Sequence, residues 1–195
     1  MLEQDLVYTG LSERNAIVLS IIAMEFSCLA KHMFFSTYAP DNTVASGFNF
    51  LLLRDEPRYA STEHKETDWP IIPADSASFF SVEEFLGDYI IAYDACHWHV
   101  PFTETRIDNP IYSEKEWQDS AHRICHLISD IMDEKLIVES FWGENANCEA
   151  KWLRTRLIFS RYFNNTRVLP EFKGYDSIRI KHRSWNSTYD SERTY

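Results

Sequence analysis

The chain has 195 residues, of which 45% are hydrophobic, and its 30 Asp and Glu against 19 Lys and Arg give a formal net charge of −11 at pH 7. A globular chain of this length buries roughly 70% of the surface that it exposes when unfolded. Five glycines argue against a turn-dense β-sandwich or barrel, and the sequence contains no P-loop or dinucleotide fingerprint. Composition therefore predicts an acidic globular protein and excludes the glycine-rich nucleotide-binding classes.

The charge is divided unevenly along the chain. Residues 1–150 hold 26 acidic and nine basic residues, a net charge of −17, whereas residues 151–195 hold four and ten, a net charge of +6. Such asymmetry is typical of a protein that meets a charged partner, or of one in which a segment packs against another. No linker coincides with the boundary, so we expect a single compact domain over residues 1–195.

The start of the chain predicts a cytoplasmic location. Glu3 and Asp5 stand where a secretory signal would carry basic residues, and no apolar run follows them. The four cysteines are therefore expected to be free thiols, as is usual in the cytoplasm.

The longest apolar stretch, residues 16–35, does not predict a membrane span. It is interrupted by Glu25 and Lys31, and charged side chains are costly inside a bilayer. Ser12 is a good N-cap, and apolar residues follow the helical period after it, so we expect a buried helix from residue 12 to about residue 35.

The secondary structure of the middle of the chain is less clearly predicted by its sequence. Residues 48–53 are an apolar run that fits a strand or a buried helix equally well, and residues 54–78 are polar and proline-containing, which predicts a long surface loop. A capping box at residues 81–84 predicts a helix start. Residues 88–94 either extend that helix or form a strand after Gly87, and we favour the strand.

The last third of the chain is expected to be helical and then extended. A second capping box at residues 113–116 predicts a helix to about residue 140, and residues 146–163 are expected to form a further helix. Residues 177–185 alternate apolar and basic side chains, which predicts a half-exposed strand. Residues 186–195 are polar and expected to be frayed. The predicted fold class is mainly α with at most a small β-sheet (α+β).

Histidines and cysteines near the middle of the chain suggest a metal site. On a helix, His122 and His126 lie one turn apart on the same face, and Cys96, His97 or His99 is a candidate third ligand. This set predicts a zinc-binding enzyme or a metal-stabilised domain. The alternative is that the two helical histidines are solvated and the cysteines are small core residues, with no cofactor bound.

The sequence favours a protein that is not an enzyme. A Cys–His nucleophile pair is conceivable from the same residues, but it requires a thiol of low pKa and an oxyanion hole that no motif indicates. Paired carboxylates are frequent, as expected on the solvated helix faces of an acidic protein.

The basic last part of the chain has two interpretations. In residues 151–185, arginines and lysines alternate with aromatic residues, which is typical of single-stranded nucleic-acid binding. The alternative is that these bases pair with the acidic bulk of the protein. A sequence pI of about 5.0 disfavours nucleic acid, because the protein repels phosphates at long range.

The acidic part predicts a protein partner. A dense negative field attracts a basic protein, and exposed tryptophans supply anchors for an interface. The overall profile resembles that of bacterial immunity proteins, a likeness of composition that implies an inhibitor of a nuclease-type toxin acting by occlusion. The expected contacts are Asp55, Glu56, Glu63, Glu66, Asp68, Trp69, Asp130, Asp133 and Glu134.

Overall fold

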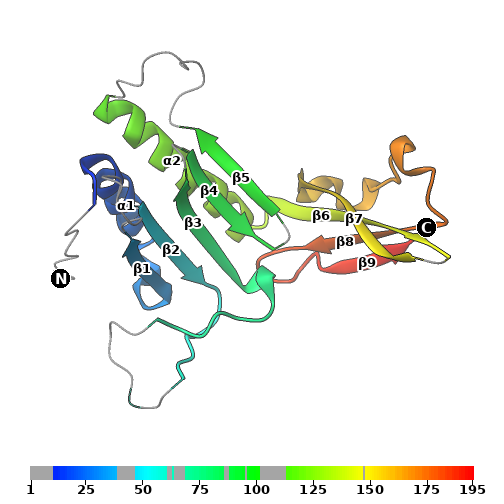
Figure 1. Ribbon diagram of the computed structural model, residues 1–195, viewed down its shortest axis with the longest axis horizontal. Helices are drawn as coiled ribbons and strands as arrows, with labels where there is room; N and C mark the ends of the chain where they lie inside the picture. Colours follow the sequence, from blue (N-terminus) through cyan, green and yellow to red (C-terminus); the bar gives the residue numbers. More distant parts are fainter. Residues whose placement is uncertain are drawn as a thin grey trace. The chain divides into compact units, whose positions relative to one another are not determined.

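The computed structural model describes residues 11–38, 47–60, 63, 69–85, 88–94, 96–101, 113–146 and 148–195. These residues form two antiparallel β-sheets and two α-helices, together with short 3₁₀ helices (Figure 1). The prediction of a mainly α, helical protein was therefore wrong. The elements in chain order are α1 (Glu13–Glu25), η1 (Ser27–His32), β1 (Met33–Tyr38), β2 (Gly47–Leu53), η2 (Ser76–Ser78), β3 (Phe79–Phe85), β4 (Asp88–Tyr93), β5 (Cys96–Pro101), α2 (Glu114–Met132), β6 (Leu136–Asn145), β7 (Cys148–Phe159), η3 (Ser160–Asn165), η4 (Pro170–Phe172), β8 (Ser177–Arg183) and β9 (Ser191–Thr194).

The chain divides into two compact units, which we describe separately. Unit 1 comprises residues 1–72, 80–91 and 98–125, and unit 2 comprises residues 73–79, 92–97 and 126–195. Neither described α-helix is both long and apolar enough to cross a bilayer.

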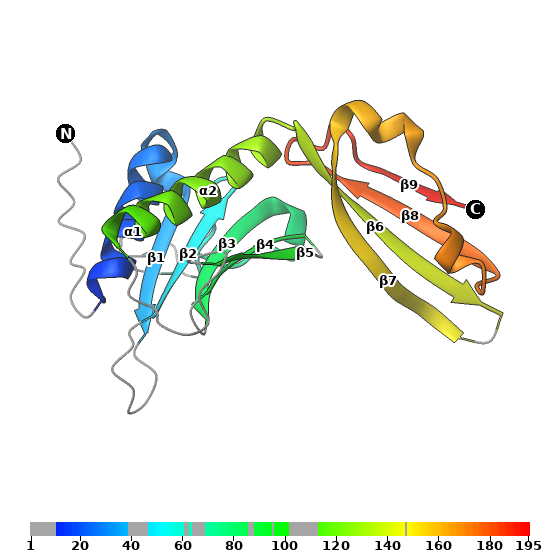
Figure 2. The same cartoon turned by 90° about the horizontal axis from the view of Figure 1, so that it is seen from above.

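Unit 1 is built on a five-stranded sheet in the order β1-β2-β3-β4-β5. Figure 2 shows α1 and the beginning of α2 on one face of this sheet. Phe48, Phe50 and Leu52 alternate along β2 and are fully buried, as are Val18 and Ile22 of α1. Because side chains alternate between the faces of a strand, one face of β2 packs against helices through these residues.

The first predicted helix is shorter than expected. The Ser12 hydroxyl accepts a hydrogen bond from the backbone N–H of Asn15, as predicted for the N-cap, but α1 ends at Glu25. The chain then forms η1 and strand β1, which pairs with β2. The aromatic residues of β1 favour extended backbone, and an apolar run by itself does not distinguish a strand from a buried helix.

The capping box at residues 81–84 was misleading. These residues lie within strand β3, where Val82 and Glu84 face inward and Glu83 is exposed. The favoured strand at residues 88–94 is confirmed as β4, and the undecided run at 48–53 is part of β2.

Unit 2 is built on a four-stranded sheet in the order β7-β6-β8-β9. Helix α2 ends at Met132, and the predicted continuation to residue 140 is instead the start of β6. The helix predicted over residues 146–163 was wrong, because β7 pairs with β6 along most of its length before η3 begins. The strand predicted over 177–185 is confirmed as β8, and the segment expected to be frayed contains β9.

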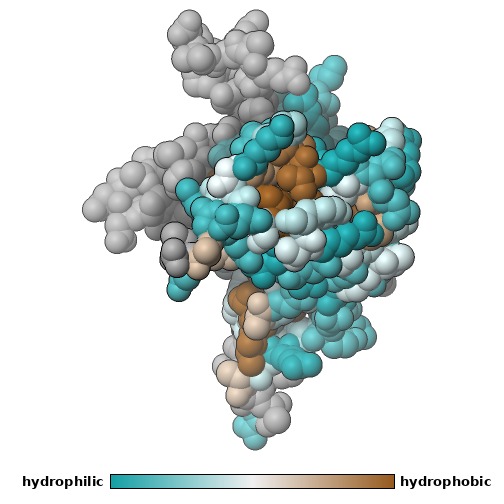
Figure 3. Space-filling model, turned by 90° about the vertical axis from the view of Figure 1, so that its right-hand side faces the viewer, coloured by the Kyte–Doolittle hydropathy of each residue, from teal (hydrophilic) through white to brown (hydrophobic). Residues whose placement is uncertain are grey.

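One face of this second sheet holds an apolar core. Phe141, Phe172, Ile178 and Ile180 are buried in it, and Phe141 and Phe172 have ring centroids 5.3 Å apart. Figure 3 shows an apolar patch recessed among hydrophilic side chains on the face of unit 2 that turns to the viewer.

Candidate functional site

The predicted partner-binding residues of unit 1 are exposed wherever they are described. Asp55 and Glu56 follow β2 directly, and Glu63 lies farther along the same excursion; all three are exposed. Glu66 and Asp68 lie outside the described residues. The acidic side chains that precede Trp69 are therefore on the surface in the part of the excursion that the structure describes.

Trp69 belongs to an exposed apolar segment that sequence reasoning did not single out as a unit. Its side chain is 41% exposed, and Ile71 and Ile72 are 52% and 43% exposed. Pro70 between them is buried, and the backbone N–H of Ile71 donates to the carbonyl of Arg58 over 2.7 Å. The two arms of the excursion thus lie side by side.

Aromatic contacts fix this segment on the sheet. The ring of Phe34 in β1 lies 6.3 Å from that of Trp69 and 6.4 Å from that of Tyr59, both in edge-to-face arrangement. Such pairs add to the stabilisation that burial alone provides. We define the surface made by Asp55, Glu56 and the Trp69–Ile72 segment as the acidic–apolar surface.

The acids predicted near the end of α2 have partners within unit 2. The Lys135 ammonium lies 3.3 Å from Asp130 and 2.9 Å from Asp133. These contacts are solvent-exposed, and exposed ion pairs contribute little to stability. Both carboxylates therefore remain accessible to a partner.

The Glu134 side chain contacts the loop between β8 and β9. Its carboxylate accepts hydrogen bonds from the backbone N–H groups of Asn186 (2.9 Å) and Thr188 (3.3 Å) in the loop between β8 and β9. Burial opposes ionisation of Glu134, but hydrogen bonds from Thr188, Ser184 and Asn186 outweigh it and lower the pKa of this carboxyl. Glu134 thus holds the loop in place.

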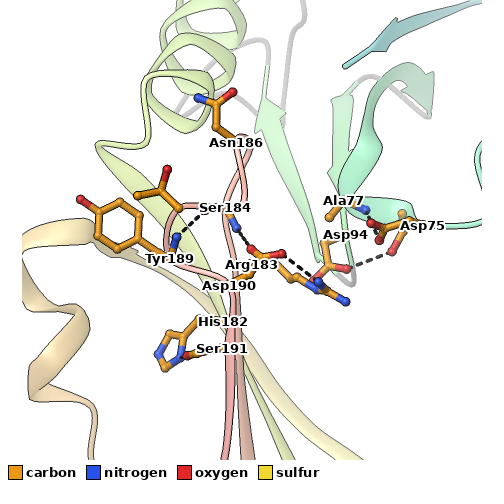
Figure 4. Close-up of polar contacts among 12 residues, drawn as sticks. Asp75, Ala77, Asp94, His182, Arg183, Ser184, Asn186, Tyr189, Asp190 and Ser191 are labelled. Carbon is orange, nitrogen blue, oxygen red and sulfur yellow. Dashed lines mark hydrogen bonds and ion pairs between the residues drawn. The ribbon is translucent and has the colours of Figure 1, made fainter. Parts of the chain in front are cut away.

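The same loop is closed by an arginine–aspartate pair (Figure 4). Arg183 Nη1 donates to Asp190 over 2.8 Å, and the other oxygen of Asp190 accepts from the backbone N–H of Ser184, also over 2.8 Å. Figure 4 shows Asp75 and Asp94 on the other side of Arg183. This arginine therefore lies among three carboxylates and balances part of their charge.

The predicted metal ligands do not form a recognisable site in the described residues. His122 and His126 are exposed on α2 and His99 is exposed on β5, whereas Cys96 is buried. Among the residues that the structure describes, no group of three or more His, Cys, Asp or Glu side chains is placed to hold a metal ion. The zinc site stays a prediction.

Cys96 and Cys125, the buried thiols among the described residues, are unsuited to nucleophilic chemistry. Burial raises the pKa of Cys96 to about 12, and the nearby Asp94 charge adds to the effect. Burial likewise raises the pKa of Cys125 to about 12. Since the thiolate is the nucleophile and both thiols are protonated near neutral pH, neither is an activated nucleophile.

A polar row crosses the sheet of unit 2 from edge to edge, and sequence reasoning missed it. Arg156 of β7, Glu139 of β6, His182 of β8 and Ser191 of β9 are direct cross-strand partners. The strand over residues 177–185 was predicted, but the partners of His182 were not foreseen because residues 146–163 were predicted to be helical.

Side-chain hydrogen bonds join the members of this row. Arg156 Nε donates to Glu139 Oε2 over 2.5 Å, and Glu139 Oε1 lies 3.1 Å from His182 Nε2. His182 Nδ1 lies 3.1 Å from the Ser191 hydroxyl, and Thr166 donates to Glu139 over 2.8 Å. Burial opposes ionisation of Glu139, but the hydrogen bonds from His182, Thr166 and Arg156, with the Arg156 charge, outweigh it and lower its pKa.

The row has the chemical order of a catalytic triad but not its accessibility. Ser191, His182 and Glu139 succeed one another as hydroxyl, imidazole and carboxylate, as in serine hydrolases. His182 and Glu139 are 0% exposed, and the Phe163 ring packs edge-on against the imidazole, with centroids 4.9 Å apart. A general base has to reach the reacting groups of a bound substrate. We therefore interpret the row as a structural hydrogen-bond network that joins the four strands.

Comparison with known proteins adds no assignment: no family model, curated protein or solved structure matches this chain. The candidate functional site is the acidic–apolar surface of unit 1.

Proposed function

We propose that the protein binds a basic protein partner through unit 1 and acts by covering that partner's surface. The observation that carries this proposal is the distribution of charge between the units. Unit 1 holds 18 acidic and eight basic residues, whereas unit 2 holds 12 and 11, so nearly all of the net charge of −11 belongs to unit 1. A field of one sign steers an oppositely charged protein and speeds its association.

The acidic–apolar surface combines acidic residues with apolar side chains that can be buried against a partner. Exposed acidic residues give attraction and orientation, but interface affinity comes mainly from a few buried aromatic and apolar anchors. Trp69, Ile71 and Ile72 are large and close together in the chain, and Trp69 packs against Phe34 of β1. We therefore expect these three side chains to be buried in the complex, with Asp55 and Glu56 at its rim.

The partner's identity is a narrower hypothesis. A nuclease-type toxin has a basic surface for nucleic acid and would suit this chemistry, and covering that surface would inhibit it. This role and the cytoplasmic location remain predictions.

The proposal is tested by partner capture with matched variants. We expect tagged full-length protein to capture a basic protein from its native host after cross-linking, and its affinity to fall at least about tenfold when Trp69, Ile71 and Ile72 are replaced by Ala, because several anchors are lost. Met24→Ala is the control, since Met24 is 71% exposed on α1 of the same unit. A captured protein that is acidic, or whose affinity is the same for both variants, would contradict the proposal.

A further inference from the structure

The recessed patch of unit 2 is apolar and partly open. Leu153, Val168, Leu169 and Tyr175 are half-buried and pack on the core formed around Phe141. Figure 3 shows the patch framed by hydrophilic side chains. An apolar centre within a polar rim is the arrangement found in protein–protein interfaces.

Two basic residues stand next to this patch in the chain. Arg167 directly precedes Val168, and Lys173 directly follows Phe172; both are exposed. Among the residues that the structure describes, neither has a carboxylate partner. Arg154, by contrast, lies 3.0 Å from Glu171.

This difference is informative because arginines of unit 2 pair readily with nearby acids. The paired arginines are Arg154, Arg156, Arg179 and Arg183, whose partners are Glu171, Glu139, Glu144 with Glu192, and Asp190. Among the described residues, no carboxylate pairs with Arg167 or Lys173, and the exposed Glu171 beside Phe172 pairs with Arg154 instead. A partner that brings its own carboxylates would complement both charges.

We infer that the surface formed by Leu153, Val168, Leu169, Arg167 and Lys173 binds an acidic segment of another protein, with an apolar side chain of that segment in the recess. This goes beyond the proposed function, because it concerns the other unit and a partner of opposite charge. Nucleic acid is the less suitable ligand, since a polyanion needs many phosphate contacts and is repelled by the negative charge of the chain.

The test is a selection of short random peptides by mRNA display on immobilised full-length protein. Peptides that also bind an Arg167→Glu/Lys173→Glu double variant are removed. We expect the enriched peptides to combine Asp or Glu with Leu, Ile, Val or Phe, and to bind the wild type at least about tenfold more tightly than the double variant, because two rim charges are reversed. Leu169→Ser should weaken the same peptides by a similar factor, because an apolar contact is lost.

A matched control separates this surface from general charge effects. Arg161→Glu/Lys181→Glu changes the net charge of unit 2 by the same amount, and Arg161 lies over the rings of Phe159 and Tyr162 instead. The enriched peptides should bind this control like the wild type. Equal melting temperatures of all variants verify folding.

Three results would overturn the inference. One is the absence of any peptide that distinguishes the wild type from the double variant. Another is an enriched set without acidic residues. The third is binding of an oligothymidylate that is lost in the Arg167→Glu/Lys173→Glu variant, which would assign the surface to nucleic acid.

Discussion

The two units differ in how they use charge. Unit 1 has 18 acidic and eight basic residues and leaves most of its negative charge uncompensated, whereas unit 2, with 12 and 11, is nearly neutral. In unit 2, ion pairs join β7 to β6 through Arg156 and Glu139, and Arg183 to the β8–β9 loop through Asp190. We infer that unit 1 generates most of the long-range electrostatic field, whereas many basic residues of unit 2 stabilise unit 2 through ion pairs.

Each unit also buries a glutamate, with a different structural consequence. In unit 1, Glu84 of β3 accepts from Arg14 over 2.6 Å and from Asn15 over 3.4 Å, and the Asn15 amide oxygen accepts from the Tyr89 hydroxyl over 3.0 Å. This network joins helix to sheet. In unit 2, Glu139 joins strand to strand within one sheet.

The largest effect is expected from Glu139→Ala. It leaves Arg156, His182 and Thr166 without their shared carboxylate, and breaking a buried ion pair from one side costs about 3 kcal/mol of unfolding free energy or more. Glu84→Ala should cost less, about 2 kcal/mol, because the Glu84 side chain keeps 11% of its surface exposed whereas that of Glu139 keeps none. Urea denaturation measures both.

Hydrogen exchange locates these two losses. Protection should fall in β6 and β8 after Glu139→Ala, and in α1 and β3 after Glu84→Ala. Glu171→Ala is the control, because its pair with Arg154 is exposed and should be worth less than about 1 kcal/mol. A loss of protection spread evenly over both units would contradict the division of the chain.

An effect similar to that of Glu84→Ala is expected from Gly143→Ala in β6. A Cβ atom at this position would clash with the ring of Tyr175, which packs on the apolar core, so the ring has to shift. Such overpacking costs about 2 kcal/mol.

The matched control for this substitution is Gly174→Ala. No atom lies within 4 Å of its Cβ position, so its effect should stay within about 1 kcal/mol, with a gain as the favoured sign. Thermal unfolding compares the two variants. Equal melting temperatures would contradict the packing of Tyr175 over β6.

In each unit the sequence predicted some elements and missed others, for physical reasons. Local signals act within a few residues, so the Ser12 cap, the start of α2 at Ser113 and the alternation of β8 were predictable. Strand β7 was not, since its state depends on pairing with β6, and tertiary pairing overrides local propensity. The polar row could not be predicted either, because its residues come from four strands and the order of those strands in the sheet has to be known first.

Acid should destabilise unit 2 through Glu139. The folded pKa of Glu139 is lowered, so this carboxylate contributes stability above its ordinary pKa of 4.5, and the contribution is lost as the pH falls through the lowered pKa. We expect the near-ultraviolet circular dichroism of the wild type to change steeply below pH 4.5. Glu139→Gln removes the titrating group, so its acid limb should be flatter, and an unchanged slope would exclude Glu139 as its cause.

The smallest effect is expected at the helix caps of unit 1. The Ser113 hydroxyl accepts from the Glu116 N–H over 3.4 Å, and the Glu116 carboxylate accepts from the Ser113 N–H over 2.6 Å. Ser113→Ala should therefore cost about 1 kcal/mol, and Ser113→Gly only a few tenths, because glycine leaves the N-cap backbone accessible to water. Urea denaturation should show this difference in unfolding free energy between the Ala and Gly variants, which is the evidence for a cap. Exchange in β6 and β8 should stay unchanged, since the cap stabilises only the first turn of α2; slower or faster exchange there would show that the two units do not respond independently.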